Sequence, residues 1–393
     1  MKKFLVLIAF WVISFPGLTS SPEGLKDFAH KQSQVQLASE IIEKLESNHL
    51  VKKDYESIRK EAFDLYLERL DPNKTVFILS ELPEINKDSF NKNLISKDLK
   101  VAFSLFNLYS DRYYSRYNLQ IDFLESVEEV DLRSSRKIKR TLSDNERTSN
   151  LEELESLWKD LIINDLIQLM LSGNDLDESI SKTTKRLNNQ LNYFEQTRVE
   201  DVFNIFVNSI TSIYGPHTSY MSPKNSEDFD INMSLSLEGI GALLSSDGLY
   251  TSISSLVPGG PAEKTEQLKP EDKIIGVGQD DDGEIVDVIG WRIDDVVDLI
   301  RGPKGSKVRL QIIPTNAISD SETEEIEIVR NVVKLEDQAA EKKILPIQRG
   351  QKNYKVGVIA LPAFYFDFEA YQKRDYNYKS SSKDVKRLLK ELK

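Results

Sequence analysis

Two glycines separated by one residue mark the stretch of this sequence that is best suited to bind a charged ligand. Gly239 and Gly241 flank Ile240, and the segment continues with apolar residues through Leu244. Glycine allows backbone conformations closed to other residues and exposes successive N–H groups, which together can hold an anion such as a carboxylate. The segment predicts a backbone anion site that leads into a strand. An ordinary turn before a strand remains the alternative for this segment alone.

The residues that follow supply the elements needed to position this turn. Residues 249–257 and 307–313 are typical of strands, and Asp247-Gly248 predicts a hairpin, because tight hairpin turns need positive φ angles. Between these strands, residues 291–301 carry apolar side chains at spacings of three and four. That spacing predicts an amphipathic helix of about three turns. Gly302-Pro-Lys-Gly305 then ends the helix.

Four phrases in this order resemble a PDZ domain of the bacterial protease type. They are Leu237-Glu-Gly-Ile-Gly241, Pro258-Gly-Gly-Pro-Ala262, Asp272-Lys-Ile-Ile-Gly276 and Gly302-Pro-Lys-Gly-Ser306. The resemblance implies that the C-terminal residues of a ligand add as a strand beside residues 240–244, with the terminal carboxylate over residues 239–241. The substrate-binding residues it implies are Leu237, Gly239, Ile240, Gly241, Ala242, Leu244, Val296, Val297 and Ile300. The alternative for the three helix residues is that they face the domain core.

The composition indicates a folded, acidic chain of more than one domain. Its 393 residues suffice for two or three domains by the usual prior of about 150 residues each. With 52 Lys and Arg against 64 Asp and Glu, the formal charge is −12, which argues against a nucleic-acid partner. Hydrophobic residues make up 39%, including 17 Phe and 15 Tyr, which is enough to build substantial cores.

The first residues have the three parts of a secretory signal peptide, predicted over residues 1–20. Met1-Lys-Lys3 precedes an apolar run to Phe15, and small polar residues follow at 19–21. The apolar run is short for a membrane span of about 20 residues, although an uncleaved anchor is the alternative. The chain has no cysteine, which excludes disulfides, a thiol nucleophile and a lipid-bearing cysteine. We therefore expect an exported protein in the periplasm, associated at most peripherally with the inner membrane.

Residues 31–213 have an almost entirely helical period. Helices are predicted over residues 35–45, 58–70, 99–117, 151–171, 178–195 and 200–213. Asp71-Pro72 ends the second of these, and Asn150 caps the fourth. Residues 131–150 combine many charges with few apolar side chains and predict a solvated connection or an exposed helix.

The last part of the chain predicts two strands and a helix. Residues 324–333 alternate as one strand, and residues 355–365 are predicted to be a buried strand that opens a new domain. Residues 380–393 predict a helix, with Ser382 as its cap.

Together with the PDZ phrases, two further phrases resemble the bacterial tail-specific proteases, also called C-terminal processing peptidases. They are Tyr193-Phe-Glu-Gln-Thr-Arg-Val-Glu-Asp-Val-Phe203 and Pro216-His-Thr-Ser-Tyr220. The sequence departs from that family in having Gly215 where an acidic residue usually stands. The resemblance implies a multidomain α+β fold: a helical domain over 21–225, a PDZ domain over 226–335, and the incomplete start of an α/β protease core over 336–393.

The resemblance also implies where the chemistry lies. Members of this family use a serine nucleophile and a lysine base, and the matching segments are not found among these residues. The three histidines are scattered, and Asp280-Asp-Asp-Gly283 lacks the ligand spacing of a calcium loop, so we expect no metal and no cofactor. His217 is expected to pack or to form a hydrogen bond, and not to act as a catalytic base. No catalytic residue is assigned in this chain.

The function implied is that of an exported serine endopeptidase that recognises apolar C-terminal tails of periplasmic proteins through its PDZ domain. This chain is expected to be its N-terminal, substrate-recognition portion, without the catalytic serine and lysine. The resemblance implies protein C-terminal tails as substrates and a lipoprotein adaptor as a further partner. The alternatives are a catalytically inactive PDZ adaptor that binds peptides, and a purely structural scaffold.

Overall fold

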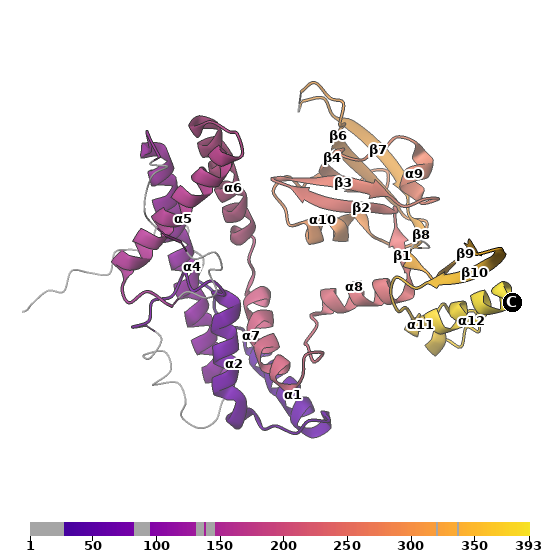
Figure 1. The fold of residues 1–393 in the computed structure, drawn as a ribbon, viewed down its shortest axis with the longest axis horizontal. Coiled ribbons are helices and arrows are strands. Elements are labelled where there is room, and N and C mark those ends of the chain that lie inside the picture. Colours follow the sequence, from indigo (N-terminus) through magenta and orange to yellow (C-terminus); the bar gives the residue numbers. More distant parts are fainter. Residues whose placement is uncertain (1–26, 82–94, 131–136, 139–145, 320, 336–337) are drawn as a thin grey trace, which may run out of the picture. The chain divides into compact units, whose positions relative to one another are not determined.

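The computed structural model describes residues 27–81, 95–130, 137–138, 146–319, 321–335 and 338–393 (Figure 1). They form two compact units, one of residues up to Ile180 with Arg198–Pro216, the other of Ser181–Thr197 with His217–Lys393. Over the described ranges, no helix combines the length and the apolar character that a membrane crossing requires. The predicted signal peptide and most of residues 131–145 lie outside the described residues.

The first unit is helical, as its sequence period predicts. Its helices are α1 (Gln32–Asn48), α2 (Tyr55–Leu70), α4 (Ile95–Ser126), α5 (Leu151–Leu171), the beginning of α6 (Leu176–Glu195), and α7 (Val199–Tyr214). The predicted cap of α5 is confirmed, since the Asn150 side chain accepts the Glu153 N–H at 2.9 Å. Helix α4 extends beyond the predicted helix over 99–117 at both ends.

A buried polar cluster ties α2 to α4. Arg59 Nε donates to Asp98 Oδ2 at 2.8 Å, and the Tyr55 hydroxyl donates to the same oxygen at 3.0 Å. Arg59 and Asp98 are both buried, so each needs the opposite charge of the other to offset the cost of removing it from water. Burial and the Asp98 charge raise the pKa of Tyr55, which keeps its phenol protonated as a donor.

The turn that ends α2 is organised by the carboxylate of Asp71. This buried side chain accepts the backbone N–H groups of Thr75, Val76 and Phe77 at 2.7, 3.2 and 3.1 Å. Arg147 forms an ion pair with the same carboxylate. One side chain therefore satisfies three backbone donors of the turn and one guanidinium that is mostly buried.

We predict that Asp71→Ala destabilises the first unit by about 3 kcal/mol or more, because it leaves buried donors and a guanidinium without their acceptor. Urea unfolding followed by tryptophan fluorescence measures this, since the buried Trp158 donates its Nε1 hydrogen to the Thr75 carbonyl of the same turn at 2.7 Å. Asp64→Ala, an exposed change on α2, is the matched control. Equal unfolding midpoints for the two variants would contradict this role for Asp71.

The second unit contains an antiparallel sheet with the strand order β2-β3-β4-β6-β7. Its elements are β2 (Ala242–Asp247), β3 (Tyr250–Leu256), α9 (Pro261–Thr265), β4 (Lys273–Gln279), β5 (Val286–Asp287), α10 (Ile293–Ile300), β6 (Lys307–Ile313) and β7 (Glu324–Val329). The predicted hairpin at Asp247-Gly248 is confirmed by the β2–β3 pairing and by a φ of 64° at Gly248. Helix α10 contacts β2 at the edge of this sheet (Figure 1).

The single strand predicted over residues 324–333 is wrong in one respect, because the chain forms two strands there. β7 pairs with β6, whereas β8 (Asn331–Lys334) pairs with β1 (Ser236–Gly239) in a separate two-stranded sheet. The break falls at Arg330, whose backbone N–H donates to the Ser306 carbonyl at 2.8 Å while its side chain turns inward. Alternation alone could not show this change of sheet.

Helix α8 (Pro223–Ser234) precedes β1 and was not predicted. None of its side chains is buried, so it lacks the apolar stripe by which surface helices are recognised. The sequence did contain a signal for the start of this helix. Ser222 caps it by accepting the Asn225 N–H at 3.3 Å, and Pro223 occupies the first helical position. The helix ends at Leu235, which has a left-handed conformation with φ of 51° and is itself buried.

The C-terminal segment forms a ribbon and helices. Strands β9 (Glu341–Arg349) and β10 (Lys352–Ala360) pair along their whole length, followed by α11 (Phe368–Gln372) and α12 (Ser381–Leu392). The prediction of a buried strand here is wrong, since most of β10 is exposed. The cap of α12 is Ser380, which accepts the Lys383 N–H at 3.4 Å, and not Ser382.

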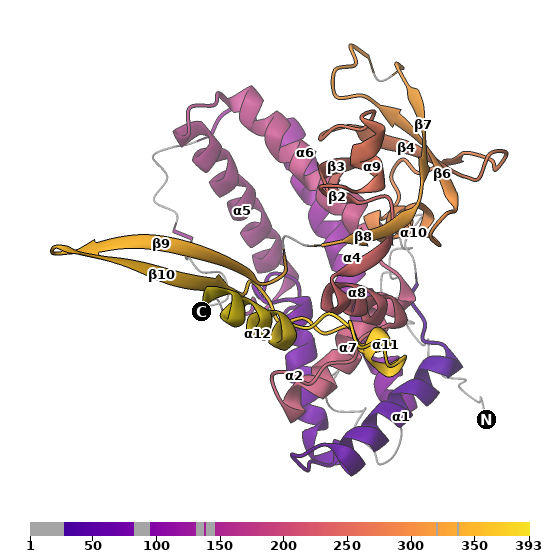
Figure 2. The same ribbon diagram turned by 90° about the vertical axis from the view of Figure 1, so that its right-hand side faces the viewer.

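Helix α12 lies against part of one face of this ribbon, and the other face carries a row of apolar side chains. Gly357 in β10 lies against α12, where an added Cβ would approach Leu392 Cδ1 to 3.0 Å; Figure 2 shows α12 along this strand. Directly paired residues share a face, and faces alternate along a strand. The opposite face therefore carries Leu345, Ile347, Tyr354, Val356 and Val358, all of them at least 36% exposed.

We predict that this apolar face promotes self-association of residues 1–393. The double change Leu345→Glu with Val356→Lys, a directly paired position, should lower static light scattering at a given concentration. The control Gln348→Glu with Asn353→Lys adds the same charges to another pair of the ribbon without removing apolar surface. A similar drop in scattering for both doubles would show that charge, and not the apolar face, governs association.

Candidate functional site

The predicted anion-binding turn is built around Gly241. Its φ is 76°, in the left-handed region that side chains rarely adopt. A Cβ at this position would lie 3.3 Å from both Gly260 Cα and Val333 Cγ2. The turn thus passes close to two other segments at a residue that has to be glycine.

Two hydrogen bonds fix the direction of the peptide groups in this turn. The Ala262 N–H donates to the Ile240 carbonyl at 2.7 Å, and the Val257 N–H donates to the Gly241 carbonyl at 2.8 Å. A trans peptide places its C=O and its N–H on opposite sides. The N–H group of Gly241 therefore points away from Ala262, and the N–H group of Ala242 points away from Val257.

Next to this turn, β2 and α10 contact each other, and the strip along the outer edge of β2 beside α10 is called the groove below. Among the described strands, β2 pairs only with β3, so its other edge is available for an added strand. Ala242 and Leu244 on β2 pack partly against the core and stay half-buried, while Leu243 is 54% exposed. On α10, Val297 is half-buried beside the groove.

Three of the predicted site residues pack in the core instead. Ile240, Val296 and Ile300 are at most 4% exposed and belong to one cluster under the sheet. For Val296 and Ile300 the alternative is therefore the one found: these side chains face the domain core. A helix side chain cannot point into both the core and the groove. Ile240 contributes its backbone only, and Leu237 packs against a second cluster around Leu235.

Arg330 holds α10 in place, and no motif or spacing in the sequence marked it as a site residue. It is 3% exposed, and burial lowers its pKa. Its acceptors are the carbonyls of Ile300 (2.7 Å), Leu299 (3.0 Å) and Lys307 (3.1 Å), the Ser306 hydroxyl (2.9 Å) and the Gln279 side-chain oxygen (2.6 Å). In the sequence, the only feature that could have pointed to Arg330 is that a charged residue interrupts the alternating pattern over residues 324–333.

Arg330→Met should destabilise the second unit by about 2–3 kcal/mol, because the carbonyls at the end of α10 lose buried donors. The measurement is urea unfolding of the whole chain followed by far-UV circular dichroism. Lys304→Met, an exposed change in the turn after α10, is the control. A stability loss no larger than that of the control would refute a clamping role for Arg330.

Comparison with protein families agrees with this geometry. Residues 41–224 match the family model described as "Tail specific protease N-terminal domain", and residues 228–313 match the PDZ domain model. Two consecutive parts of the chain thus match the N-terminal and PDZ domains of tail-specific proteases. Its multidomain α+β fold is the one expected of that arrangement.

Individual relatives match this chain over different lengths. The Tail-specific protease of Haemophilus influenzae is 34% identical over 363 residues, 90% of this chain and 49% of that protein. The Carboxy-terminal processing protease CtpA of Bacillus subtilis is 39% identical over 103 residues, 26% of this chain and 21% of that protein. The chain thus spans about half the length of the first relative and less of the second.

One solved structure corresponds to a smaller part of this chain. It is the PDZ domain of the carboxy-terminal protease from Vibrio cholerae in complex with peptide, which is 53% identical to this chain. It covers 25% of this chain and 99% of its own, with a TM-score of 0.24.

Two other candidates for chemistry, His217 and a metal site, gain no support from the described residues. His217 is exposed, which contradicts packing in a core, while the other expectation for it, a hydrogen bond, stays a prediction. Within the described ranges, no group of three or more histidine, aspartate or glutamate side chains is placed to hold a metal ion. The groove between β2 and α10 is therefore the strongest candidate site.

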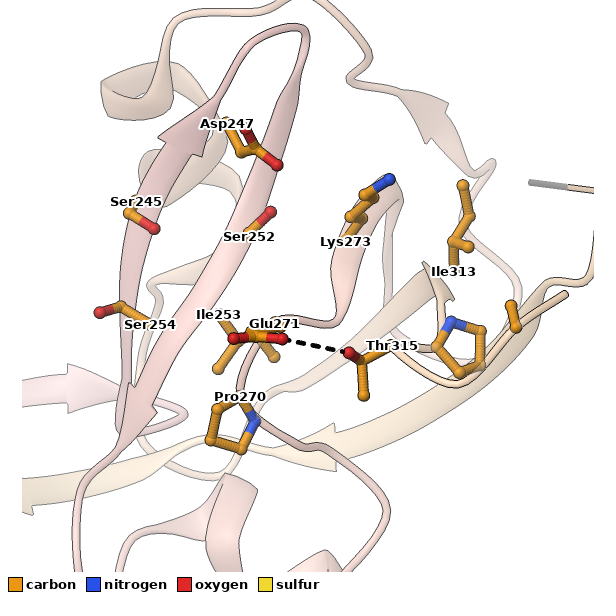
Figure 3. A pocket seen from close by; sticks show the side chains of 12 residues that line it. Ser245, Asp247, Ser252, Ile253, Ser254, Pro270, Glu271, Lys273, Ile313 and Thr315 are labelled. Atoms are coloured by element: carbon orange, nitrogen blue, oxygen red, sulfur yellow. Dashed lines mark hydrogen bonds between the residues drawn. The ribbon is translucent and has the colours of Figure 1, made fainter. Parts of the chain in front are cut away.

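A second, polar pocket of about 550 Å³ lies on the PDZ sheet (Figure 3). Its polar lining residues are Ser245, Asp247, Ser252, Ser254, Glu271, Lys273 and Thr315. The Thr315 hydroxyl is 3.5 Å from Glu271, and Lys273 lies 4.7 Å from the Tyr250 ring centre. None of the nine predicted site residues lines this pocket, so it is distinct from the groove.

Proposed function

We propose that this chain is the substrate-recognition portion of an exported C-terminal processing serine endopeptidase, and that it binds apolar C-terminal tails in the groove between β2 and α10. One observation carries the proposal. The consecutive N–H groups of Gly241 and Ala242 point away from Ala262 and Val257, which bind the carbonyls of the same peptide groups. Beside them, β2 has an edge that pairs with no other described strand. Two consecutive backbone donors beside an open strand edge suit a chain that ends in a carboxylate.

The groove suggests how a tail binds. The tail adds as a strand to β2, so its backbone pairs with the edge of the sheet, and its last carboxylate accepts the N–H groups of Gly241 and Ala242. Leu244 on β2 and Val297 on α10 are both half-buried, and because the two elements contact each other, these side chains are proposed to offer apolar contact to the tail. The sheet supplies affinity for any extended tail, and these side chains select apolar ones.

Cleavage is assigned to a core domain that begins with residues 336–393. The chemistry proposed there is attack by a serine hydroxyl whose proton passes to a lysine, which must be neutral to accept it. Residues 1–393 are proposed to lack that pair. The second candidate function, a catalytically inactive peptide-binding adaptor, uses the same groove and differs only in the absence of hydrolysis.

The setting proposed is the periplasm, supported by the three-part signal peptide pattern over residues 1–20. Substrates would be periplasmic proteins with exposed apolar C-termini. A lipoprotein adaptor and peripheral contact with the inner membrane belong to the same proposal.

We predict that Gly241→Val abolishes binding of an apolar peptide with a free C-terminus, measured by fluorescence anisotropy, with an unchanged far-UV dichroism spectrum. The added side chain meets Gly260 and Val333 and turns the N–H groups from their direction. Gly305→Val is the matched control, because Gly305 also has a positive φ, of 88°, but an added Cβ meets nothing within 4 Å. Equal affinities of wild type and Gly241→Val for the peptide would contradict the assignment of this turn as the carboxylate-binding site.

Hydrolysis of the same peptide, followed in parallel, separates the two candidate functions. Binding without cleavage by residues 1–393 is the expected result. Cleavage that a serine substitution in this chain abolishes would mean that a catalytic pair is present here, and the assignment of cleavage to a further core would be wrong.

A further inference from the structure

The polar pocket of Figure 3 is built on one row of side chains that crosses four strands of the PDZ sheet. Ser245 on β2 pairs with Ser252 on β3, which pairs with Lys273 on β4, and Lys273 pairs in turn with Ile313 on β6. Directly paired residues share one face of a sheet, and faces alternate along each strand. The core cluster under the sheet holds the residues next in sequence to the row: Ile253, Ile274 and Ile312. The row therefore lies on the face turned away from the core.

Ser252 is the most deeply placed polar side chain of this row. It is only 8% exposed, and no hydrogen bond joins its hydroxyl to any group in the part of the chain that the structure describes. Its oxygen points into the pocket, on the side where Lys273 lies (Figure 3). A hydroxyl can donate one hydrogen bond and accept two, and a buried polar group without a partner is costly. The pocket thus holds a polar group that a bound molecule can satisfy.

One wall of the pocket is a loop that Asp272 holds in place. Its buried carboxylate accepts the N–H groups of Lys269 at 2.7 Å and of Thr315 at 2.8 Å. Glu271 has a φ of 73°, and its N–H donates to the Ile253 carbonyl at 2.7 Å. A residue other than glycine keeps such a conformation only where its surroundings impose it. Glu271 and Thr315 are therefore fixed beside the row.

The charges around the pocket favour a neutral ligand. Asp247 and Glu271 disfavour an anion, whereas Lys273 disfavours a cation. The other polar groups are hydroxyls, which both donate and accept hydrogen bonds. These are the hydroxyls of Ser245, Ser252, Ser254 and Thr315. A ligand that itself carries several hydroxyl groups matches this lining.

The lining also includes an apolar patch. Ile313 is 5% exposed but lies outside the core cluster that contains its neighbour Ile312, and Pro270 and Pro314 lie beside the same pocket. A pyranose ring combines a face of C–H groups with a rim of hydroxyls, so it can use the patch and the polar rim together. The volume of about 550 Å³ is in the range of small-molecule sites.

We propose that this pocket binds a neutral saccharide of one or two rings. The hydroxyls of Ser252 and Thr315 exchange hydrogen bonds with ring hydroxyls, and the Lys273 ammonium donates to a ring oxygen. The carboxylates of Glu271 and Asp247 accept from further hydroxyls, and the C–H face of the ring packs against Ile313. The site is separate from the groove, so the chain can hold a glycan and a protein tail at once. The inference does not depend on the proposed function of the groove.

The test measures ligand binding to residues 1–393 by saturation-transfer difference NMR. The neutral probes are maltose, cellobiose and chitobiose, and the charged probes are putrescine and inorganic phosphate. At least one disaccharide should bind, and Ser252→Ala should raise its dissociation constant about fivefold, because the change removes one hydroxyl without adding volume. Lys273→Met should weaken binding by a similar factor, because it removes the donor and keeps an apolar stem.

Ser246→Ala is the matched control, because Ser246 is an exposed serine of the same hairpin that pairs with Thr251 on the opposite face. It should keep the wild-type dissociation constant, and so should Gly241→Val, which alters the groove. The inference is overturned if no disaccharide binds, if only putrescine or phosphate binds, or if Ser246→Ala weakens binding as much as Ser252→Ala. Loss of saccharide binding in Gly241→Val would place the saccharide in the groove and would also overturn it.

Discussion

The direction of two peptide groups is the constraint on which the candidate site depends. The carbonyls of Ile240 and Gly241 are held by N–H donors from Ala262 and Val257, and planarity then turns the following N–H groups outward. The arrangement needs Gly241 at positive φ, because a side chain would meet the neighbouring backbone of Gly260. The site thus consists of backbone donors, and side chains contribute mainly by holding them still.

Two buried charged groups show how the two units hold loops without apolar packing. Asp71 collects three backbone N–H groups in the first unit, and Arg330 collects three backbone carbonyls in the second. In each case a single side chain satisfies polar groups that a helix end or a turn leaves open. The position of α10 beside β2 depends on Arg330 in this way.

Local patterns predicted many elements well. The strand over residues 307–313, the hairpin at Asp247-Gly248 and the cap at Asn150 follow from alternation, turn chemistry and capping, and all are confirmed. The failures have a common cause. Alternation over 324–333 could not show that Arg330 divides two sheets, and apolar residues of β10 could not show that they would be exposed. Helix α8 lacked an apolar stripe and escaped detection.

The sequence by itself determined that a helical part precedes a PDZ part, and it determined the glycine turn and the apolar positions around it, because each is encoded by residues close together in the chain. Only the tertiary structure decided which of those apolar residues serve the core, as Val296 and Ile300 do, and which border the groove, as Val297 does. It alone brought Asp228 to Arg301 and Arg330 to the end of α10. Such contacts join residues far apart in the chain, and their partners depend on how elements pack, which no local spacing records.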